Sequence, residues 1–481
     1  MEASSKAPLK LNYKRTLLIG FAFFGILLLW QVYDSWCPTF LQELFRNSMY
    51  PNYASMTPVE QAQATKSVQY LVGVMMAIDN LAALILLPIF GRISDKTNTR
   101  IGKRMPYILV GTFVCAVAFP FIPVLFHYNN LVGVIVLMAI VVLFSMMYRN
   151  PAVALMPDIT PKPLRSKANG LINIMGYIGG AFATVVGIVF VLSKYLGTKS
   201  TDSWQYHNIW AIVAPFLIAS VLMVASAVVL FITIKENKIR DEMKDEMARG
   251  ELEAEVVDQV VEDKPMTKAN RTMLIFILAA EFFWFMADNG IGTFLVNYTL
   301  NFLGTDSSYA MINTIVGGVG SVLGFAVGGI IASKIGRKWT VVGGLGLTVL
   351  GYVLWTLLTF TVSGLAGSGT FPIWLYIVWF LKGLGMSLVH VNSFPMVVEL
   401  CPNSKIGQFT GYYYASSMAA QTITPVALGA LLFAPSFGWE FVPVYGLACV
   451  AISFIFFMFI KNVKSKKTTF KKGLEALDQD D

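Results

Sequence analysis

The stretch GRISDKTNTRIGKR, residues 91–104, lies between two long apolar runs and recurs in shortened form as GIIASKIGRK at residues 329–338. Both copies begin with glycine, carry a polar residue and lysine at the fifth and sixth positions, and close on Ile-Gly followed by two basic residues. The longer copy has four additional residues before that closing motif. A stretch repeated in corresponding places favours a duplicated chain of two related halves.

A second repeat lies in the first apolar run of each half. Asp34 is followed after four residues by Thr-Phe-Leu at 39–41, and Asp288 is followed at the same distance by Thr-Phe-Leu at 293–295. Two matches in corresponding runs predict two bundles of similar topology. In such a body the binding site is expected at the seam between the bundles, near the bilayer midplane.

The composition is that of a membrane protein. Hydrophobic residues make up 56% of the 481 residues and charged residues 13%, with a mean hydropathy of +0.64. Soluble domains carry about 25% charged residues, so a soluble globular enzyme is excluded. We predict an all-α membrane protein with twelve transmembrane helices in two pseudo-symmetric six-helix bundles. The helices are expected at 15–36, 67–92, 105–126, 131–156, 167–193, 208–234, 271–302, 308–333, 339–361, 371–399, 406–433 and 440–461.

The predicted domains follow from one polar interruption. Residues 1–235 form the N-terminal six-helix bundle, 236–270 a charged and partly helical cytoplasmic linker, and 271–481 the C-terminal bundle with a basic tail. Within the linker, Glu236 and Arg240 have the i,i+4 spacing of a helical ion pair.

The distribution of basic residues predicts the orientation. With a cytoplasmic N-terminus, thirty of the 36 Lys and Arg lie on inner segments and four on outer ones. Because inner loops carry the excess of positive charge, we expect a multi-pass protein of the cell membrane with both termini cytoplasmic. The basic residues lie in short loops and not on one polar face, so nucleic acid is not an expected partner.

Residue types for cofactor chemistry are sparse. Four cysteines occur without a C-x-x-C pair, three histidines are far apart, and no P-loop motif is present. We therefore expect no metal site, no catalytic residues and no resident cofactor.

Ionisable residues within the predicted spans are the main functional candidates. Each one is costly in hydrocarbon, so each is functional by default and needs a partner. We assign Asp79, Glu281 and Lys382 to ion coupling, with Asp79 as the carrier of a proton or sodium ion. Lys382 and Arg149 are equally compatible with a counterion role toward the buried acids.

A polar and aromatic stripe accompanies these charges. Carboxylates and amides hydrogen-bond hydroxyl groups, and an aromatic ring packs against the apolar face of a sugar, so we expect a polyhydroxylated substrate. Packing or interfacial anchoring is an equal alternative for the two tryptophans, and a proline kink is an equal alternative around Asn392. The residues predicted to bind substrate are Trp30, Gln31, Asp34, Arg149, Trp284, Asp288 and Asn392.

The repeated loop is predicted to act as a gate on the cytoplasmic side. Its glycines permit close approach, its basic residues hold it at the cytoplasmic surface, and its acid can pair with them. The alternative is a loop that only follows the positive-inside rule. The predicted gating residues are Gly91, Asp95, Arg100, Gly102, Lys103 and Arg104.

These motifs resemble a known family. Residues 94–107, SDKTNTRIGKRMPY, are similar to the S-D-R-x-T-S-R-x-G-R-R-R-P-F signature of sucrose/proton symporters, a branch of the major facilitator superfamily. Melibiose-type cation symporters of the glycoside-pentoside-hexuronide group carry a looser version. Residues 151–169 resemble the P-x-R-A-L-x-x-D…R-x-x-A-N motif of the same carriers, with Val153 in place of its arginine and Arg149 one turn earlier.

The resemblance implies the major facilitator fold and alternating access. We expect a secondary transporter that couples a proton or sodium ion to symport of a glycoside or small oligosaccharide, acting as a monomer in the bilayer. One alternative is a lysolipid or drug carrier of the same fold, which would have a broadly apolar cavity. The other is a membrane sensor that transports nothing.

Overall fold

The computed structural model describes residues 9–197, 201–260, 267–401 and 406–460, and the regular elements in those ranges are all helices. Twelve helical segments there are long and apolar enough to cross a membrane. The predicted all-α, twelve-span fold is confirmed, and the chain is a multi-pass membrane protein.

The first half runs from α1 to α9. Its helices are α1 (Tyr13–Met49), α2 (Pro58–Ser67), α3 (Gln69–Lys96), α4 (Met105–Ala118), α5 (Phe121–His127), α6 (Leu131–Asp158), α7 (Arg165–Val189), α8 (Leu192–Tyr195) and α9 (Ile209–Thr233), with short 3₁₀ turns η1 (Tyr53–Ser55) and η2 (Lys162–Leu164). Two linker helices follow, α10 (Glu236–Glu242) and α11 (Lys244–Val260).

The second half runs from α12 to α17. Its elements are α12 (Lys268–Asn301), α13 (Ser307–Ile335), α14 (Arg337–Thr361), α15 (Trp374–Leu400), α16 (Ile406–Phe433), η4 (Trp439–Phe441) and α17 (Val442–Phe459).

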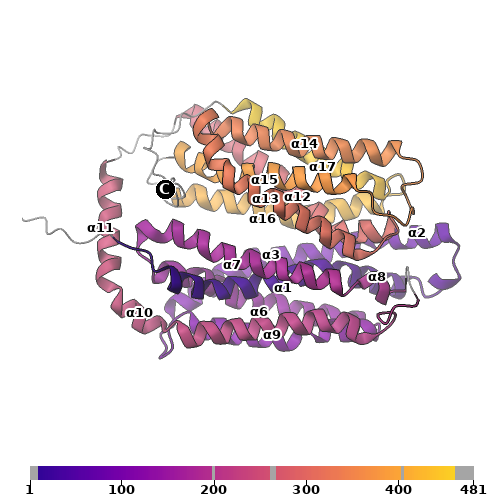
Figure 1. The fold of residues 1–481 in the computed structure, drawn as a ribbon, viewed down its shortest axis with the longest axis horizontal. Coiled ribbons are helices and arrows are strands. Elements are labelled where there is room, and N and C mark those ends of the chain that lie inside the picture. Colours follow the sequence, from indigo (N-terminus) through magenta and orange to yellow (C-terminus); the bar gives the residue numbers. More distant parts are fainter. Residues whose placement is uncertain (1–8, 198–200, 261–266, 402–405, 461–481) are drawn as a thin grey trace, which may run out of the picture.

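The two halves lie side by side, and α10 and α11 cross one end of the molecule (Figure 1). We call this end the linker end, and the opposite end, where α2 projects, the far end. In the first half α1 packs on α6, α7 and α9, while in the second α12 packs on α16 and α17 and both α13 and α14 pack on α15. Contact between the halves runs mainly along α3 with α16 and along α7 with α13.

The first helix continues past its predicted end at residue 36. Helix α1 extends to Met49 because Phe40, Leu41 and Leu44 are buried in the core. Burial of those side chains stabilises three further turns, although polar residues lower the local hydropathy.

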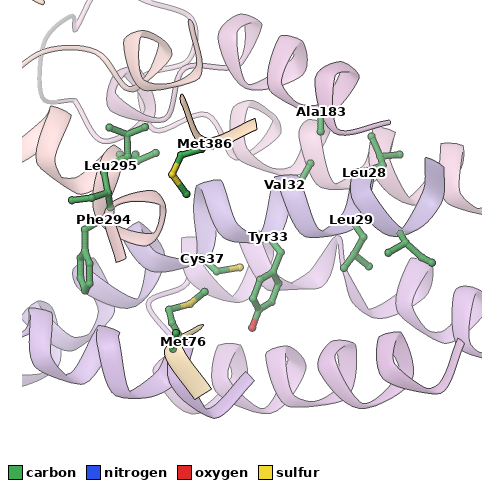
Figure 2. Close-up of a cluster of buried hydrophobic side chains, with 14 of the residues drawn as sticks. Leu28, Leu29, Val32, Tyr33, Cys37, Met76, Ala183, Phe294, Leu295 and Met386 are labelled. Atoms are coloured by element: carbon green, nitrogen blue, oxygen red, sulfur yellow. The ribbon is translucent and has the colours of Figure 1, made fainter. Parts of the chain in front are cut away.

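Side chains from both halves meet around the middle of α1 (Figure 2). Cys37 of α1 lies near Met76 of α3, and Phe294 and Leu295 of α12 approach from the second half. Tyr33 points away from this contact into the first half. Its hydroxyl group is a polar atom inside an apolar core and therefore needs a partner.

The repeated loops share an unusual backbone conformation. Gly102 has φ +121° shortly before α4, and Gly336 has φ +89° directly before α14. Residues with a side chain rarely adopt this region, so the glycine is required in both copies. The sequence repeat thus corresponds to a repeated turn in the structure.

Candidate functional site

A buried acid lies between α1 and α3. The Tyr33 hydroxyl donates a 2.6 Å hydrogen bond to Oδ2 of Asp79, and both residues are buried. Asp34 is close enough to interact electrostatically with Asp79 on one side and with Arg149 of α6 on the other. Asp34 itself is exposed. Because α1 packs against α6, α7, α9 and α12, the exposed Asp34 side chain lies in a space between helices.

The second half holds a direct ion pair. Lys382 Nζ of α15 lies 2.6 Å from Asp288 Oδ1 of α12, and the two side chains are 16% and 42% exposed. His390 of α15 also interacts electrostatically with both. The counterion role that the sequence allows for Lys382 is directed at Asp288 in the structure, and not at Asp79. Lys382 and Asp288 lie in the same half, on helices that pack together.

The two charge clusters follow the internal repeat. Asp34 and Asp288 occupy equivalent places in the repeated motif. Asp288 forms an ion pair with Lys382, and Asp34 interacts electrostatically with Arg149; each cation comes from the fourth spanning helix of its own half. Carboxylates accept hydrogen bonds from hydroxyl groups, and guanidinium and ammonium groups donate them. The arrangement therefore suits a ligand rich in hydroxyl groups.

Two residues predicted to bind substrate are inaccessible in this conformation. Trp284 is fully buried, with its ring edge-on to His390 and packed on Phe457. Asn392 is also fully buried, and its Nδ2 donates to the Leu388 carbonyl of the same helix. Neither side chain can touch a ligand unless the second half rearranges.

Trp30 and Gln31 are partly exposed beside Asp34. The Trp30 ring lies edge-on to Tyr33, with centroids 5.4 Å apart, and Gln31 Nε2 donates to Ser35 Oγ at 3.2 Å. Their assignment to substrate binding stays a prediction.

The repeated loop is held by a buried arginine at the linker end. Arg104 is paired with Asp95, and its Nε donates to Asp158 Oδ2 at 2.8 Å. Lys103 Nζ lies 3.0 Å from the same Asp158 oxygen. Burial disfavours the guanidinium charge, but Asp158 and Asp95 outweigh that cost and raise the pKa of Arg104. The loop is thus anchored mainly at the end of α6.

The linker binds this loop from the other side. Glu236 is buried, and its carboxylate accepts hydrogen bonds of 2.8–3.1 Å from the backbone amides of Lys103, Arg104 and Met105 at the start of α4. A carboxylate satisfies the free amides and the positive dipole of a helix N-terminus. The predicted Glu236–Arg240 pair is therefore wrong, because Glu236 caps α4 instead.

The other predicted gating residues have modest roles here. Gly91 lies against the Asn150 amide of α6, and Arg100 is exposed, with its carbonyl accepting from Asn237 Nδ2. In the described ranges, the hydrogen bonds and ion pairs of residues 91–104 end on the first half or on α10. The loop therefore does not bridge the two halves in this conformation.

If the loop biases the conformational equilibrium, Asp158→Asn should slow turnover more than Asp95→Asn. The Asp158 variant loses two cationic partners in a largely buried site, whereas the Asp95 side chain is 58% exposed, where an ion pair is worth about 0–1 kcal/mol. We expect a drop of a few fold for Asp95→Asn and about tenfold or more for Asp158→Asn, with ligand affinity nearly unchanged. Turnover and equilibrium binding measured on both variants check this, and unchanged turnover with lost binding contradicts it.

A buried amide network joins the halves at the far end. Thr39 Oγ1 donates to Asn297 Oδ1 at 2.7 Å, and Gln42 Oε1 accepts from Gln69 Nε2 and Asn301 Nδ2, both at 2.8 Å. These residues come from α1, α3 and α12. Sequence reasoning missed them because it searched only for charges. The available signal was a set of Gln and Asn side chains at the outer ends of the first, second and seventh apolar runs.

Close backbone packing reinforces this far-end contact. A side chain at Gly73 of α3 would collide with the Pro425 carbonyl of α16, and one at Gly429 would collide with the Gln69 carbonyl. Nearer the middle, Asn80 Nδ2 donates to the Gln421 carbonyl at 3.0 Å. The structure is therefore closed between the halves at the far end.

Gln69→Leu should weaken the far-end seal. The substitution leaves Gln42 with one fewer donor and puts an apolar group among buried amides, at a cost of about 1–3 kcal/mol. We expect the closed-to-open ratio to fall by about tenfold, with more labelling of a cysteine placed at the partly exposed Ser35 by a membrane-impermeant thiol reagent. Val110→Leu, an apolar change at an exposed position of α4, is the control. Equal labelling of both variants contradicts the seal.

A groove of about 380 Å³ opens between α3 and α16. It is lined by Val74, Ala77, Ile78, Leu81, Thr422, Ile423, Val426 and Ala427. Its lining contains no charged side chain, whereas the two acid–base clusters offer groups that hydrogen-bond hydroxyls. We therefore place the candidate site at the clusters and not in the groove.

Comparisons with known proteins agree with this architecture. A family model described as Major Facilitator Superfamily matches residues 39–369 and 277–478. A lactose permease of Lactobacillus helveticus is 22% identical over 306 residues, which is 62% of this chain and 45% of that protein. The match thus spans less than half the length of that relative.

Solved structures show the same fold. The inward-open xylose transporter XylE from E. coli has a TM-score of 0.63 and 14% identity, covering 96% of this chain and 98% of its own. A bacterial homologue of the iron transporter ferroportin, in an inward-facing state, has a TM-score of 0.63 and 13% identity, covering 93% and 99%. At these identities the similarity establishes the fold alone.

Proposed function

The chain belongs to the Major Facilitator Superfamily and is a transporter of that fold; we propose that it is a cation-coupled symporter of a glycoside or small oligosaccharide. The observation that carries the proposal is the repeated acid–base arrangement. Asp34 with Arg149 and Asp288 with Lys382 supply acceptors and donors from both halves. A sugar has hydroxyl groups able to bind both kinds of partner at once.

The sequence relative supports a sugar as the solute. It is named a lactose permease. Together with the loop motif, it favours the sucrose/proton symporter-like branch of the glycoside-pentoside-hexuronide group. The excess of basic residues at the linker end supports a cytoplasmic position for that end and for both termini.

We assign the coupling ion to Asp79. This carboxyl group is buried, receives a hydrogen bond from Tyr33 and lies beside the exposed Asp34. A proton or sodium ion bound there would change the charge next to the substrate site. Occupancy by the ion would then favour substrate binding, as symport requires.

The alternative substrate class is an apolar one. The groove between α3 and α16 has the lining that a lysolipid or an apolar drug would need. None of its lining residues is ionisable, so the groove itself offers no group that binds a coupling ion. We therefore rank this reading second.

Uptake into proteoliposomes tests the proposal. A panel of radiolabelled mono-, di- and trisaccharides would be offered with an inward pH gradient, an inward sodium gradient or neither, together with a fluorescent lysolipid. We expect accumulation of at least one saccharide under one imposed gradient. Transport of the lysolipid alone would overturn the proposal in favour of the second class. Absence of transport for every solute would reject both.

A further inference from the structure

Glu281 is an unpaired acid inside the second half. Its side chain lies on α12 with a relative exposure of 0%, and neither carboxyl oxygen has a hydrogen-bond partner within the described part of the chain. Four other acids differ, because Asp79 accepts from Tyr33, Asp288 pairs with Lys382, Asp34 interacts electrostatically with Arg149, and Asp158 binds Arg104.

Two interhelical hydrogen bonds fix the position of Glu281. Ser416 Oγ of α16 donates to the Leu278 carbonyl, and Thr424 Oγ1 donates to the Met286 carbonyl. These bonds lie on either side of Glu281 along α12 and hold the two helices in register. The acid is therefore enclosed in a tightly packed seam and not in a frayed segment.

Other polar groups lie near this seam. Tyr413 of α16 interacts electrostatically with Glu281, and its hydroxyl is hydrogen-bonded to Ser393 Oγ of α15 at 2.8 Å. Asn392 Oδ1 and Trp284 Nε1 are buried, and neither has a hydrogen-bond partner among the residues that the structure describes. His390 on α15, which contacts Trp284, faces Asp288 and Lys382 further along.

An ionised carboxylate is expensive in this setting. A buried charge without a partner costs several kcal/mol, whereas a neutral carboxylic acid avoids most of that cost. Tyr413 and Ser393 are neutral and offer no compensating positive charge. The geometry therefore fits an acid that holds its proton in this conformation.

We propose that Glu281 is a second proton-carrying site, enclosed in the second half and separate from Asp79. When the second half rearranges and water reaches the acid, its O–H bond breaks. The proton then passes to water, and the carboxylate keeps the electron pair. The hydroxyl pair of Tyr413 and Ser393 lies closer to the linker end than Glu281 does, because Tyr413 precedes Ser416, which bonds to Leu278. The pair could pass the proton toward that end. This inference does not depend on the identity of the transported solute.

Infrared spectroscopy tests the proposal without a substrate. The full-length protein in an ester-free detergent at neutral pH should show the C=O stretch of a protonated carboxylic acid, with the downward shift in D₂O typical of an exchangeable proton. We expect Glu281→Gln to lose one such band. The matched control Glu251→Gln removes an exposed carboxylate on α11 and should keep it.

A conservative variant distinguishes loss of the carboxyl group from loss of the fold. Glu281→Asp keeps a carboxyl group and should shift the band without removing it, with the same gel-filtration profile as the native protein. An unchanged set of bands in Glu281→Gln would overturn the proposal, because Glu281 would then be ionised. Loss of the band on replacing potassium with sodium at constant pH and ionic strength would also overturn it, since Glu281 would then bind a cation.

Discussion

Asp79→Asn is expected to abolish accumulation against a gradient while leaving exchange of substrate across the membrane intact. Asparagine keeps the shape of the side chain and can still accept a hydrogen bond from Tyr33, but it cannot bind and release a proton or balance a sodium ion. In the proposed mechanism the substrate binds to Asp34, Asp288 and their cations, and these residues remain in the variant. Binding should therefore survive, and coupling should not.

Two assays on the same proteoliposomes separate these effects. An inward gradient of one pH unit is worth about 1.4 kcal/mol per proton, enough for roughly tenfold accumulation. With Asp79→Asn the steady-state ratio should fall to about one, while exchange of labelled for unlabelled sugar proceeds near the native rate. Tyr33→Phe, which keeps the acid and removes its donor, should retain accumulation with an altered pH dependence.

Two outcomes would contradict this assignment. Full accumulation by Asp79→Asn would move the coupling ion to Asp288 or Glu281. Recovery of accumulation in the double variant Asp79→Asn, Lys382→Gln would make Asp79 a mere partner of Lys382. We expect no such recovery, because Lys382 is bound to Asp288.

The fold was predictable from the sequence because membrane insertion depends on a one-dimensional pattern. Apolar runs must be long enough to cross the bilayer whatever their neighbours, so twelve spans follow from hydropathy. The predicted end of α1 at residue 36 was wrong because tertiary packing, and not local hydropathy, determines where this helix ends. Its last turns are stabilised by Phe40 and Leu41 packing against other helices, and hydropathy does not record tertiary contacts.

The site was only partly predictable. Intramembrane charges can be identified from their cost in hydrocarbon, which is why Asp34, Asp79 and Lys382 could be singled out. Their partners depend on helix rotation and depth, so the Asp288–Lys382 pair became visible only in the structure. Helix rotation also placed Trp284 in the core, where no spacing argument would have located it.

Polar contacts that involve no ion pair were the hardest to predict. Glu236 is one of many charges in the linker sequence, yet its carboxylate binds the amides at the start of α4. Gln42 and Gln69 carry no charge, so the high cost of placing a charge in hydrocarbon did not identify them as functional candidates. Their importance comes from joining two halves that are distant in sequence.

Lys382→Gln is expected to destabilise the protein and to abolish transport together. It leaves Asp288 in the bundle without its counterion. Breaking a fully buried pair costs about 3–5 kcal/mol and an exposed pair about 0–1. Since the Asp288 side chain is 42% exposed, we expect about 1–3 kcal/mol, measured as a lower midpoint of thermal unfolding in detergent.

The double variant Asp288→Asn, Lys382→Gln distinguishes a functional pair from a structural one. Removing both charges eliminates the unpaired carboxylate, so the unfolding midpoint should return close to the native value. Sugar uptake should stay at background, because the donor and acceptor that the second half offers to hydroxyl groups are both changed. Lys238→Gln, which breaks an exposed pair with Glu242 on α10, should alter neither measurement. If uptake recovered along with stability in the double variant, the pair would serve only to hold α12 against α15, and the substrate contacts of the second half would have to lie elsewhere.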